Sequence, residues 1–472
     1  MDTMNNHSSF KSMHGLFIIW SGQMISGIAT SAMLFAQLHW ISEKSAANGT
    51  ALAYWESFYF AAYLIFVLFA LFFVDHLPRK TLMLFYEFLL AFTTLGLLLL
   101  ESAGGLQLWH LYLNAVMLGI GHALWLPTYS SVITILVPRK QHVRANGMLS
   151  LLYDTPDMIG PLLVSVLYIA LGLRGFLIIN LITYIFSIGA LLLVPIPRTP
   201  AETLDLTIRA LFREAADGIL YIIGHPGLLG IQLVFFLGNI FSGIALSFTA
   251  LYTMIALRTH GNIGIADTIQ SAEAWAAVVA GLAISVFGGI KRPVIAILLG
   301  WLVSSMFGLT MFGVGQVLLI WVIAAVVESF FGPVVDVAFS KIIQSKVPPE
   351  VQGRVFGASD FLAQIPFLFT PLLAGYFGDK IFEPLMHENG LWVNTFGWLV
   401  GSGPGAGYGL MILFCGVGGT LVALWGLLNP TIRWANKNMP DIILPPPVGM
   451  VRKTQPIPTS ASTKENINKI QG

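Results

Sequence analysis

The sequence predicts an all-α polytopic membrane protein, and three observations support this fold class. Of the 472 residues, 56% are hydrophobic and only 10% are charged, whereas a soluble domain carries about a quarter charged residues. The mean hydropathy is +0.79. The apolar residues form long runs, and a helix of about 20 apolar residues spans a hydrocarbon layer about 30 Å thick. A β-barrel is excluded, because its strands alternate over about ten residues.

Twelve apolar runs are present, and they predict twelve transmembrane helices. Their ranges are 16–39, 52–74, 81–100, 108–136, 147–171, 175–194, 228–256, 265–288, 293–314, 316–340, 357–378 and 408–428. The first run follows only Lys11 and has no small-residue cleavage site close behind it. We therefore interpret it as a retained helix and not as a signal peptide.

The composition argues against several other classes of protein. The single cysteine, Cys415, excludes a disulfide scaffold. The net charge of +1 gives no indication of a nucleic-acid partner. The chain has no GxSxG, HExxH or GxxxxGKS motif, so neither an enzyme nor an ATP-driven pump is expected. No Cys/His cluster is present either, so no metal and no other cofactor is expected.

The basic residues predict the orientation of the chain. All but four of the 24 Lys and Arg residues lie on one side of the predicted helices, together with both chain ends. The exceptions are Lys44, Arg174, Arg258 and Lys380. Because cytoplasmic loops carry an excess of Lys and Arg, both termini are predicted to be cytoplasmic. We expect a multi-pass protein of a bacterial inner (cytoplasmic) membrane.

The chain contains an internal repeat at a constant offset of 210 residues. VPRKQHVRANG at 137–147 matches VPPEVQGRVFG at 347–357, and the register continues from Pro156 and Pro161 to Pro366 and Pro371. Two parallel six-helix repeats that rock about a site at their interface are typical of transporters with alternating access. The alternative is an old duplication in a membrane protein that transports nothing.

The repeat predicts four parts of the chain. They are an N-terminal six-helix bundle at 1–194, a cytoplasmic linker at 195–227, a C-terminal six-helix bundle at 228–429 and a disordered cytoplasmic tail at 430–472. Residues 204–222 of the linker have the spacing of an amphipathic helix. We favour a linker helix covered by the protein over one lying on the membrane. No role is assigned to the long outer loop at 379–408.

The predicted loop between the second and third helices resembles a known motif. FFVDHLPRK at 72–80 resembles the loop motif of the major facilitator superfamily. The resemblance implies that Asp75 pairs across helix ends and that Arg79 and Lys80 help to hold one conformation. The second half repeats the basic pair as Lys291 and Arg292 in GGIKR at 288–292, without the acid.

The resemblance covers nearly the whole chain. The VP…R…G elements of both halves, WSGQMIS at 20–26 and the segment 383–414 are similar to the third branch of drug:proton antiporters, which contains macrolide-efflux and enterobactin-exporter-like proteins. Gly160 and Pro161 resemble the glycine-proline motif of facilitator antiporters, although Val164 and either Leu163 or Ser165 stand where that motif has a glycine pair. A plain proline kink is the alternative interpretation.

Acidic residues within the predicted helices are candidates for proton coupling, because a charge in hydrocarbon is costly and marks function by default. Glu328 lies about 18 Å and Asp157 about 15 Å from the nearer helix end, at 1.5 Å per residue. Asp154 is one turn from Asp157, and Glu273 lies about 12 Å deep. A structural acid is the alternative for each, and it is the favoured interpretation for Glu273 and for Glu87.

Further residues are candidates for conformational control and for a substrate cavity. Arg144 and Arg354 begin matching inner helices and serve either gating or plain orientation of the chain. Polar and aromatic side chains at membrane depth are predicted to line a substrate cavity, with ordinary packing or interhelical hydrogen bonding as the alternative. They are Gln23, His122, Trp125, Asn239 and Ser242.

These observations together predict a secondary active transporter. It would export a small amphipathic molecule, such as a drug, an antibiotic or a siderophore, by proton antiport with alternating access. Its partners would be that substrate, protons and the lipid bilayer, without nucleic acid or an obligate protein partner, and it would be a monomer. The alternatives are a proton-coupled importer of a small metabolite and a non-transporting receptor or lipid-handling protein on the same scaffold.

Overall fold

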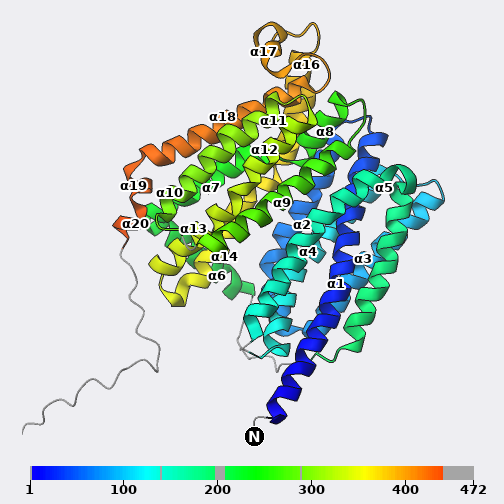
Figure 1. Ribbon diagram of the computed structural model, residues 1–472, viewed down its shortest axis with the longest axis vertical. Helices are drawn as coiled ribbons and strands as arrows, with labels where there is room; N and C mark the ends of the chain where they lie inside the picture. The colour runs from blue at the N-terminus through cyan, green and yellow to red at the C-terminus, as the bar shows by residue number, and fades with distance from the viewer. Residues whose placement is uncertain (1–2, 139–140, 197–207, 288–289, 440–472) are drawn as a thin grey trace, which may run out of the picture.

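The computed structural model describes residues 3–138, 141–196, 208–287 and 290–439, and every regular element in them is helical (Figure 1). The elements of the first part are α1 (Thr3–Lys44), α2 (Gly49–His76), α3 (Arg79–Ser102), α4 (Leu108–Leu136), α5 (His142–Leu193) and α6 (Ile208–Gly224). Those of the second part are α7 (Pro226–Ala245), α8 (Phe248–Arg258), α9 (Gly264–Phe287), α10 (Pro293–Val303), η2 (Ser304–Leu309), α11 (Thr310–Val314), α12 (Leu318–Phe330), α13 (Gly332–Lys346), α14 (Pro349–Gln364), η3 (Ile365–Leu368), α15 (Thr370–Phe377), η4 (Gly378–Phe382), α16 (Glu383–Met386), α17 (Val393–Val400), α18 (Ala406–Leu428), α19 (Pro430–Arg433) and α20 (Ala435–Asn438). The predicted all-α membrane fold is confirmed.

The described residues contain ten helices that are long and apolar enough to cross a membrane. One of them is the long helix α5, which reverses at Gly172 and returns as a second pass (Figure 1). Gly172 has φ 56°, a conformation that glycine adopts without a steric penalty. The helix α9, with 24 residues, is not among the ten. The count of twelve and the cytoplasmic termini stay predictions.

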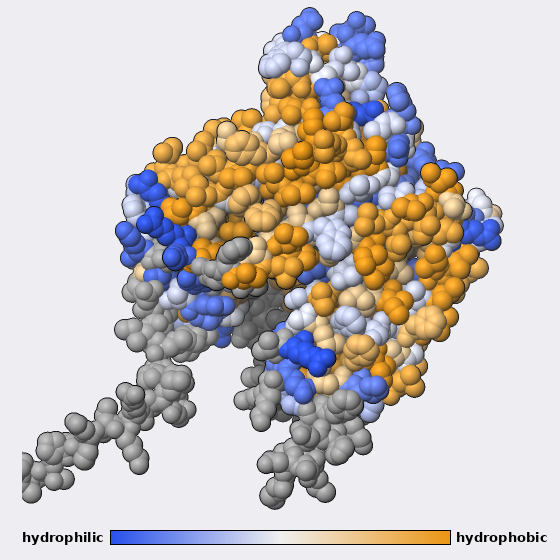
Figure 2. All heavy atoms as spheres, in the orientation of Figure 1, coloured by the Kyte–Doolittle hydropathy of each residue, from blue (hydrophilic) through white to orange (hydrophobic). Residues whose placement is uncertain are grey.

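The helices form two groups, α1–α5 (the N-terminal bundle) and α7–α18 (the C-terminal bundle) (Figure 1). We call the side on which α1 begins the N-terminal side, and the side that carries α16 and α17 the loop side. The surface of both bundles is rich in hydrophobic residues, as a lipid-facing surface requires (Figure 2).

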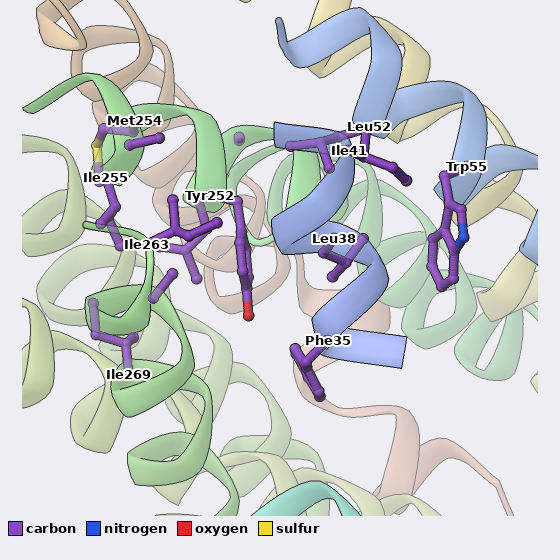
Figure 3. Packing of buried hydrophobic residues seen from close by; sticks show 14 of the residues in the cluster. Phe35, Leu38, Ile41, Leu52, Trp55, Tyr252, Met254, Ile255, Ile263 and Ile269 are labelled. Carbon is purple, nitrogen blue, oxygen red and sulfur yellow. The ribbon is translucent and has the colours of Figure 1, made fainter. Parts of the chain in front are cut away.

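Among the described residues, the hydrophobic core that the bundles share lies toward the loop side. There, residues of α1 and α2 such as Phe35 and Leu52 form one cluster with residues of α8 and α9 such as Tyr252 and Ile269 (Figure 3). Toward the N-terminal side each bundle has a separate cluster of its own. Burial of apolar area therefore holds the bundles together on the loop side and not on the N-terminal side.

The predicted repeat has matching hydrogen bonds in both bundles. The N–H of Val137 donates to Ile133 O at 3.0 Å, and that of Val347 donates to Ile343 O at 3.0 Å. In the next turn, His142 Nε2 lies 2.8 Å from Val137 O, and Gln352 Nε2 donates to Val347 O at 2.8 Å. Each pair of positions differs by 210, so these ends of α4 and α13 support the predicted register.

Several predicted helix bounds differ from the structure. The predicted helix 228–256 is two helices, α7 and α8, because Ser247 caps α8 through a 3.1 Å bond from Ala250 N–H to its Oγ. The linker helix is α6, and it packs closely on α14, since Gly218 lies against the backbone of Arg354. Residues 197–207 of the linker and 440–472 of the tail lie outside the described residues.

Three of the four basic residues that depart from the predicted orientation have partners on the loop side. Lys44 lies over the ring of Trp40 at 5.8 Å, and Arg174 Nε lies 3.8 Å from Glu101 Oε2. The guanidinium of Arg258 donates to three carbonyl oxygens, those of Gly405, Gly315 and Val400. These local contacts account for basic side chains at this end of the helices.

Because Gly160 has no side chain, α5 packs closely on α1 at this position. A Cβ at position 160 would lie 2.7 Å from Ser31 Cβ and 2.9 Å from Ala32 N, whereas at Gly189 of the same helix nothing lies within 4 Å. We expect Gly160→Val to lower the free energy of unfolding by about 1–3 kcal/mol through overpacking. A lower thermal midpoint of the purified protein checks this, with Gly189→Val as the matched control. Equal midpoints for the two variants would contradict it.

Candidate functional site

Two neighbouring cavities, of about 760 and 590 Å³, lie between the bundles. Side chains of both bundles line both cavities, so the two form one central space. The shared residues are Phe60, Phe248, Gln270, Glu273 and Gln364. Figure 2 shows the surface hollowed between the bundles toward the N-terminal side.

Glu328 lines the cavity of the C-terminal bundle, as do Asn239 and Ser242. Its carboxylate accepts hydrogen bonds from Ser304 Oγ and Ser329 Oγ, both at 3.2 Å. Ser304 begins the π-helix η2, and such π-helical turns are frequent at functional sites. Two hydroxyl donors thus hold this carboxylate in place.

Glu273 of α9 lines both cavities. Its Oε1 is buried and has no hydrogen-bond partner among the described residues. Buried polar atoms without a partner are rare in proteins and call for an explanation. This acid, for which the sequence favoured a structural role, therefore has an oxygen available to a ligand, as does Glu87 with its unpartnered Oε2.

A polar cluster in the N-terminal bundle is centred on Gln23. The amide of Gln23 donates to Glu87 Oε1 at 2.6 Å and to Ser187 Oγ at 2.8 Å, and its oxygen accepts from Trp125 Nε1 at 3.0 Å. Ser187 Oγ also donates to Glu87 Oε1 at 3.0 Å. Three of these residues, Gln23, Glu87 and Trp125, line the second cavity, so Glu87 belongs to the candidate site.

Asp157 also lines the second cavity, and Ser31 Oγ donates to it at 3.4 Å. Asp154, one turn away, is exposed but is not among the lining residues. His122 lines the cavity with its Nδ1 bonded to the hydroxyl of Tyr59. The structure thus separates the predicted pair, and only Asp157 faces the cavity.

The lining of the central space is acidic and aromatic. Besides the acids above, three acids that were not predicted as site residues line the larger cavity, namely Glu56, Asp336 and Asp360. Neither lysine nor arginine is among the described residues that line the two cavities. Aromatic faces such as those of Phe235 and Trp301 complete the lining, and such faces attract cations.

Polar contacts between the bundles close the space on the loop side. Glu56 of α2 accepts from the N–H groups of Phe248 and Thr249 at 3.3 and 3.2 Å and from Thr249 Oγ1 at 3.1 Å, at the start of α8. In the opposite direction, Asp379 of η4 accepts from Thr50 N–H at 2.9 Å and Thr50 Oγ1 at 2.7 Å, at the start of α2. Each bundle thus supplies a carboxylate to a helix N-terminus of the other, where negative charge is favoured.

The residues of the predicted loop motif lie on the N-terminal side. Arg79 Nε donates to Ser131 Oγ at 3.2 Å, and Lys80 Nζ donates to the carbonyls of Leu192 and Val194 at 3.1 and 2.9 Å, at the end of α5. The side chain of Asp75 lies outside the described residues.

The other basic candidates for gating are exposed. They are Arg144, Lys291, Arg292 and Arg354. Arg354 Nη1 lies 4.0 Å from Asp217 Oδ2 of α6, so it joins the linker helix to α14. Pro161 is buried within α5 beside Gly160. The gating roles of these residues stay predictions.

Two apolar helix bundles around a polar central space define a membrane transporter. The model of the Major Facilitator Superfamily matches residues 19–261, and the chain belongs to this family. The predicted resemblance is thereby confirmed. The protein is a multi-pass transporter of the cell membrane and not an enzyme.

Relatives with known names are similar over most of the chain. Macrolide efflux protein A of Streptococcus pyogenes is 21% identical over 368 residues, which cover 77% of this chain and 89% of that protein. Macrolide efflux protein A of Enterococcus faecalis is 22% identical over 286 residues, covering 60% of this chain and 87% of that protein. These relatives support the predicted likeness to the macrolide-efflux branch.

Solved transporter structures share the fold. A structure of the nucleoside transporter NupG superposes with a TM-score of 0.66 at 12% identity, covering 87% of this chain and 98% of that one. A bacterial homologue of the iron transporter ferroportin, in an inward-facing state, gives a TM-score of 0.63 at 13% identity, with 87% and 99% covered. At these identities the likeness concerns the fold alone.

Proposed function

We propose that this protein exports a small, amphipathic, positively charged molecule in exchange for protons, by alternating access. The observation that carries the proposal is the lining of the central space, which combines several carboxylic acids with aromatic rings and has no described lysine or arginine. An organic cation gains from both groups, since carboxylates pair with its charge and ring faces attract it.

The two ends of the central space favour alternating access. Apolar packing and carboxylate contacts close the loop side, while separate clusters leave the bundles apart on the N-terminal side. Such an arrangement is one of the two end states of a rocking motion of two bundles about a fixed site. With the predicted orientation, this state opens toward the cytoplasm, from which an exporter takes its substrate.

Export is favoured over uptake because the named relatives are efflux proteins. Macrolide antibiotics that carry a basic amine also fit an acidic, aromatic lining. Siderophore export, uptake by symport and a receptor role have no specific observation in their favour. Protons are proposed as the exchanged ion because carboxylates that line the central space, such as Glu273 and Asp157, can load and release them as access alternates. A monomer is proposed because each chain encloses a complete central space.

Accumulation in efflux-deficient cells tests the proposal. Cells that express the protein are expected to accumulate less of an amine-bearing macrolide and of a cationic dye than cells with an empty vector, and an uncoupler is expected to remove the difference. A neutral dye of similar size should accumulate equally in both. Asp157→Asn should weaken the effect. Lowered accumulation that survives the uncoupler would contradict proton antiport, and equal accumulation of every compound would contradict export.

A further inference from the structure

A third polar contact between the bundles, besides those of Glu56 and Asp379, lies buried in the loop-side core. His39 of α1 and Asp267 of α9 are 4% and 0% exposed, and their Nε2 and Oδ2 atoms are 3.2 Å apart. Tyr252 of α8 donates to the other carboxylate oxygen of Asp267 at 2.5 Å. In Figure 3 Tyr252 lies between residues of α1, such as Leu38, and residues of α9 and the segment before it.

The close approach of His39 Nε2 and Asp267 Oδ2 requires one proton to be held by one of the two side chains. His39 Nδ1 lies 3.2 Å from the carbonyl oxygen of Phe35, and a carbonyl only accepts, so Nδ1 carries a hydrogen. In a neutral ring Nε2 then has a lone pair, which faces Asp267 Oδ2. That oxygen has no hydrogen-bond partner among the described residues. Two facing lone pairs repel unless a proton lies on the ring or on the carboxyl group.

The described groups around the pair supply no positive charge that would balance the carboxylate of Asp267. The ring of Tyr168 from α5 lies 4.5 Å from that of His39 between centroids, and its hydroxyl donates to Glu43 of α1 at 3.3 Å. Tyr252 approaches from α8, Glu56 of α2 caps the start of that helix, and Glu273 lies further along α9. The titratable groups that the described residues place around the pair are thus tyrosines and acids, so a proton is what neutralises the buried carboxylate.

Polar side chains along α9 connect the pair with the central space. Ser271, one turn after Asp267, is buried, and its Oγ has no hydrogen-bond partner in the described part of the chain. Glu273 follows two residues later and lines both cavities. Six residues of helix separate Asp267 from Glu273, which is about 9 Å. Ser271 and Glu273 are thus polar groups of α9 that lie between the pair and the cavity along the helix.

We propose that His39 and Asp267 form a proton-binding site that holds one proton while the loop side is closed and releases it when the bundles separate there. The role of the site rests on the proposed proton antiport. When the loop side opens, the two side chains part and Asp267 meets water, where a carboxyl group gives up its proton at neutral pH. The closed state therefore binds the proton more tightly, and raising the pH weakens the closure.

The test follows the loop side by distance measurement between two spin labels, without any substrate. The labels are placed on exposed residues of the two bundles, as Lys44→Cys and Asn262→Cys in a Cys415→Ala background, in the purified full chain. Between pH 5 and pH 9 the long-distance population of the otherwise unchanged protein is expected to grow, by up to about tenfold per pH unit for a single linked proton. A control pair within the N-terminal bundle, Lys44→Cys and Ala103→Cys, should keep one distance.

Two variants decide whether the pair of His39 and Asp267 causes the pH dependence of the loop-side distance. In Asp267→Asn the amide can donate to His39 Nε2 as a protonated acid would, so the loop side should stay closed at every pH. His39→Gln keeps the buried carboxyl group but removes the imidazole, so it should shift the pH at which the loop side opens, and it serves if the first variant does not fold. A pH response unchanged by both variants, or no response in the parent protein, would overturn the proposal. Because no substrate is present, failure of the export assay leaves this result standing.

Discussion

Replacing Glu273 by glutamine is expected to lower the export rate of a cationic substrate at least about 30-fold. Glu273 reaches both parts of the central space, and its free carboxylate oxygen has no partner among the described residues. Removing one member of a buried charge pair costs about 2–5 kcal/mol, because the other charge is left unpaired. The initial efflux rate from proteoliposomes with an imposed pH gradient measures the effect.

Two further variants make this result specific. Asp154 is also an acid within a predicted transmembrane helix, but it does not line the cavities. The export rate of Asp154→Asn should therefore equal that of the parent protein. Glu328→Gln should reduce export less than Glu273→Gln, since an amide oxygen still accepts from Ser304 or Ser329. The reverse order of the two glutamines would assign the main role to Glu328, as the sequence analysis did.

Replacing Glu56 by alanine is expected to shift the loop side toward the open state at least about tenfold. The variant removes three hydrogen bonds to one carboxylate and leaves the N–H groups of Phe248 and Thr249 without this partner in the closed state. Each hydrogen bond to a charged group contributes about 1.5–3 kcal/mol. The same two spin labels report the shift, measured at constant pH, and export should fall with it.

Glu101→Ala is the matched control for this variant. Glu101 also lies on the loop side, but it faces Arg174 of its own bundle, whose side chain is 61% exposed. Exposed ion pairs contribute about 0–1 kcal/mol, so its distance distribution should not change. An unchanged distribution in Glu56→Ala as well would show that apolar packing alone closes the loop side.

Much of the fold was predictable because burial in lipid imposes long apolar runs. The runs near 81–100 and 108–136 match α3 and α4 within a few residues. All five residues predicted to line a substrate cavity do line the central space, since polar groups in a membrane helix avoid lipid. The same rule applied to Glu56 and Asp267, which lie in the predicted helices 52–74 and 265–288, would have singled them out.

The contact partners of these two acids could not be predicted from sequence patterns. Glu56 meets Thr249 and Asp267 meets His39 across the two bundles, and such contacts depend on how the bundles are placed. The internal repeat agrees with these contacts once they are known. In each bundle, an acid on the second transmembrane pass contacts the first pass of the other bundle. The apolar run 228–256 also did not reveal the end of one helix and the start of the next at Ser247. The run stays apolar there, and the helices are divided by the capping side chain of Ser247.

The three carbonyl contacts of Arg258 also have a mechanical consequence. This one side chain ties the end of α8 to Gly315, before α12, and to Val400 and Gly405, before α18. These contacts therefore stiffen this end of the C-terminal bundle, which in the proposed motion would transmit displacement as one body. The connection between α1 and α2 holds Ala46 and Ala47 at φ 51° and 58°, where alanine is strained. In the proposed rocking motion, this short segment is where elastic energy would be stored and released.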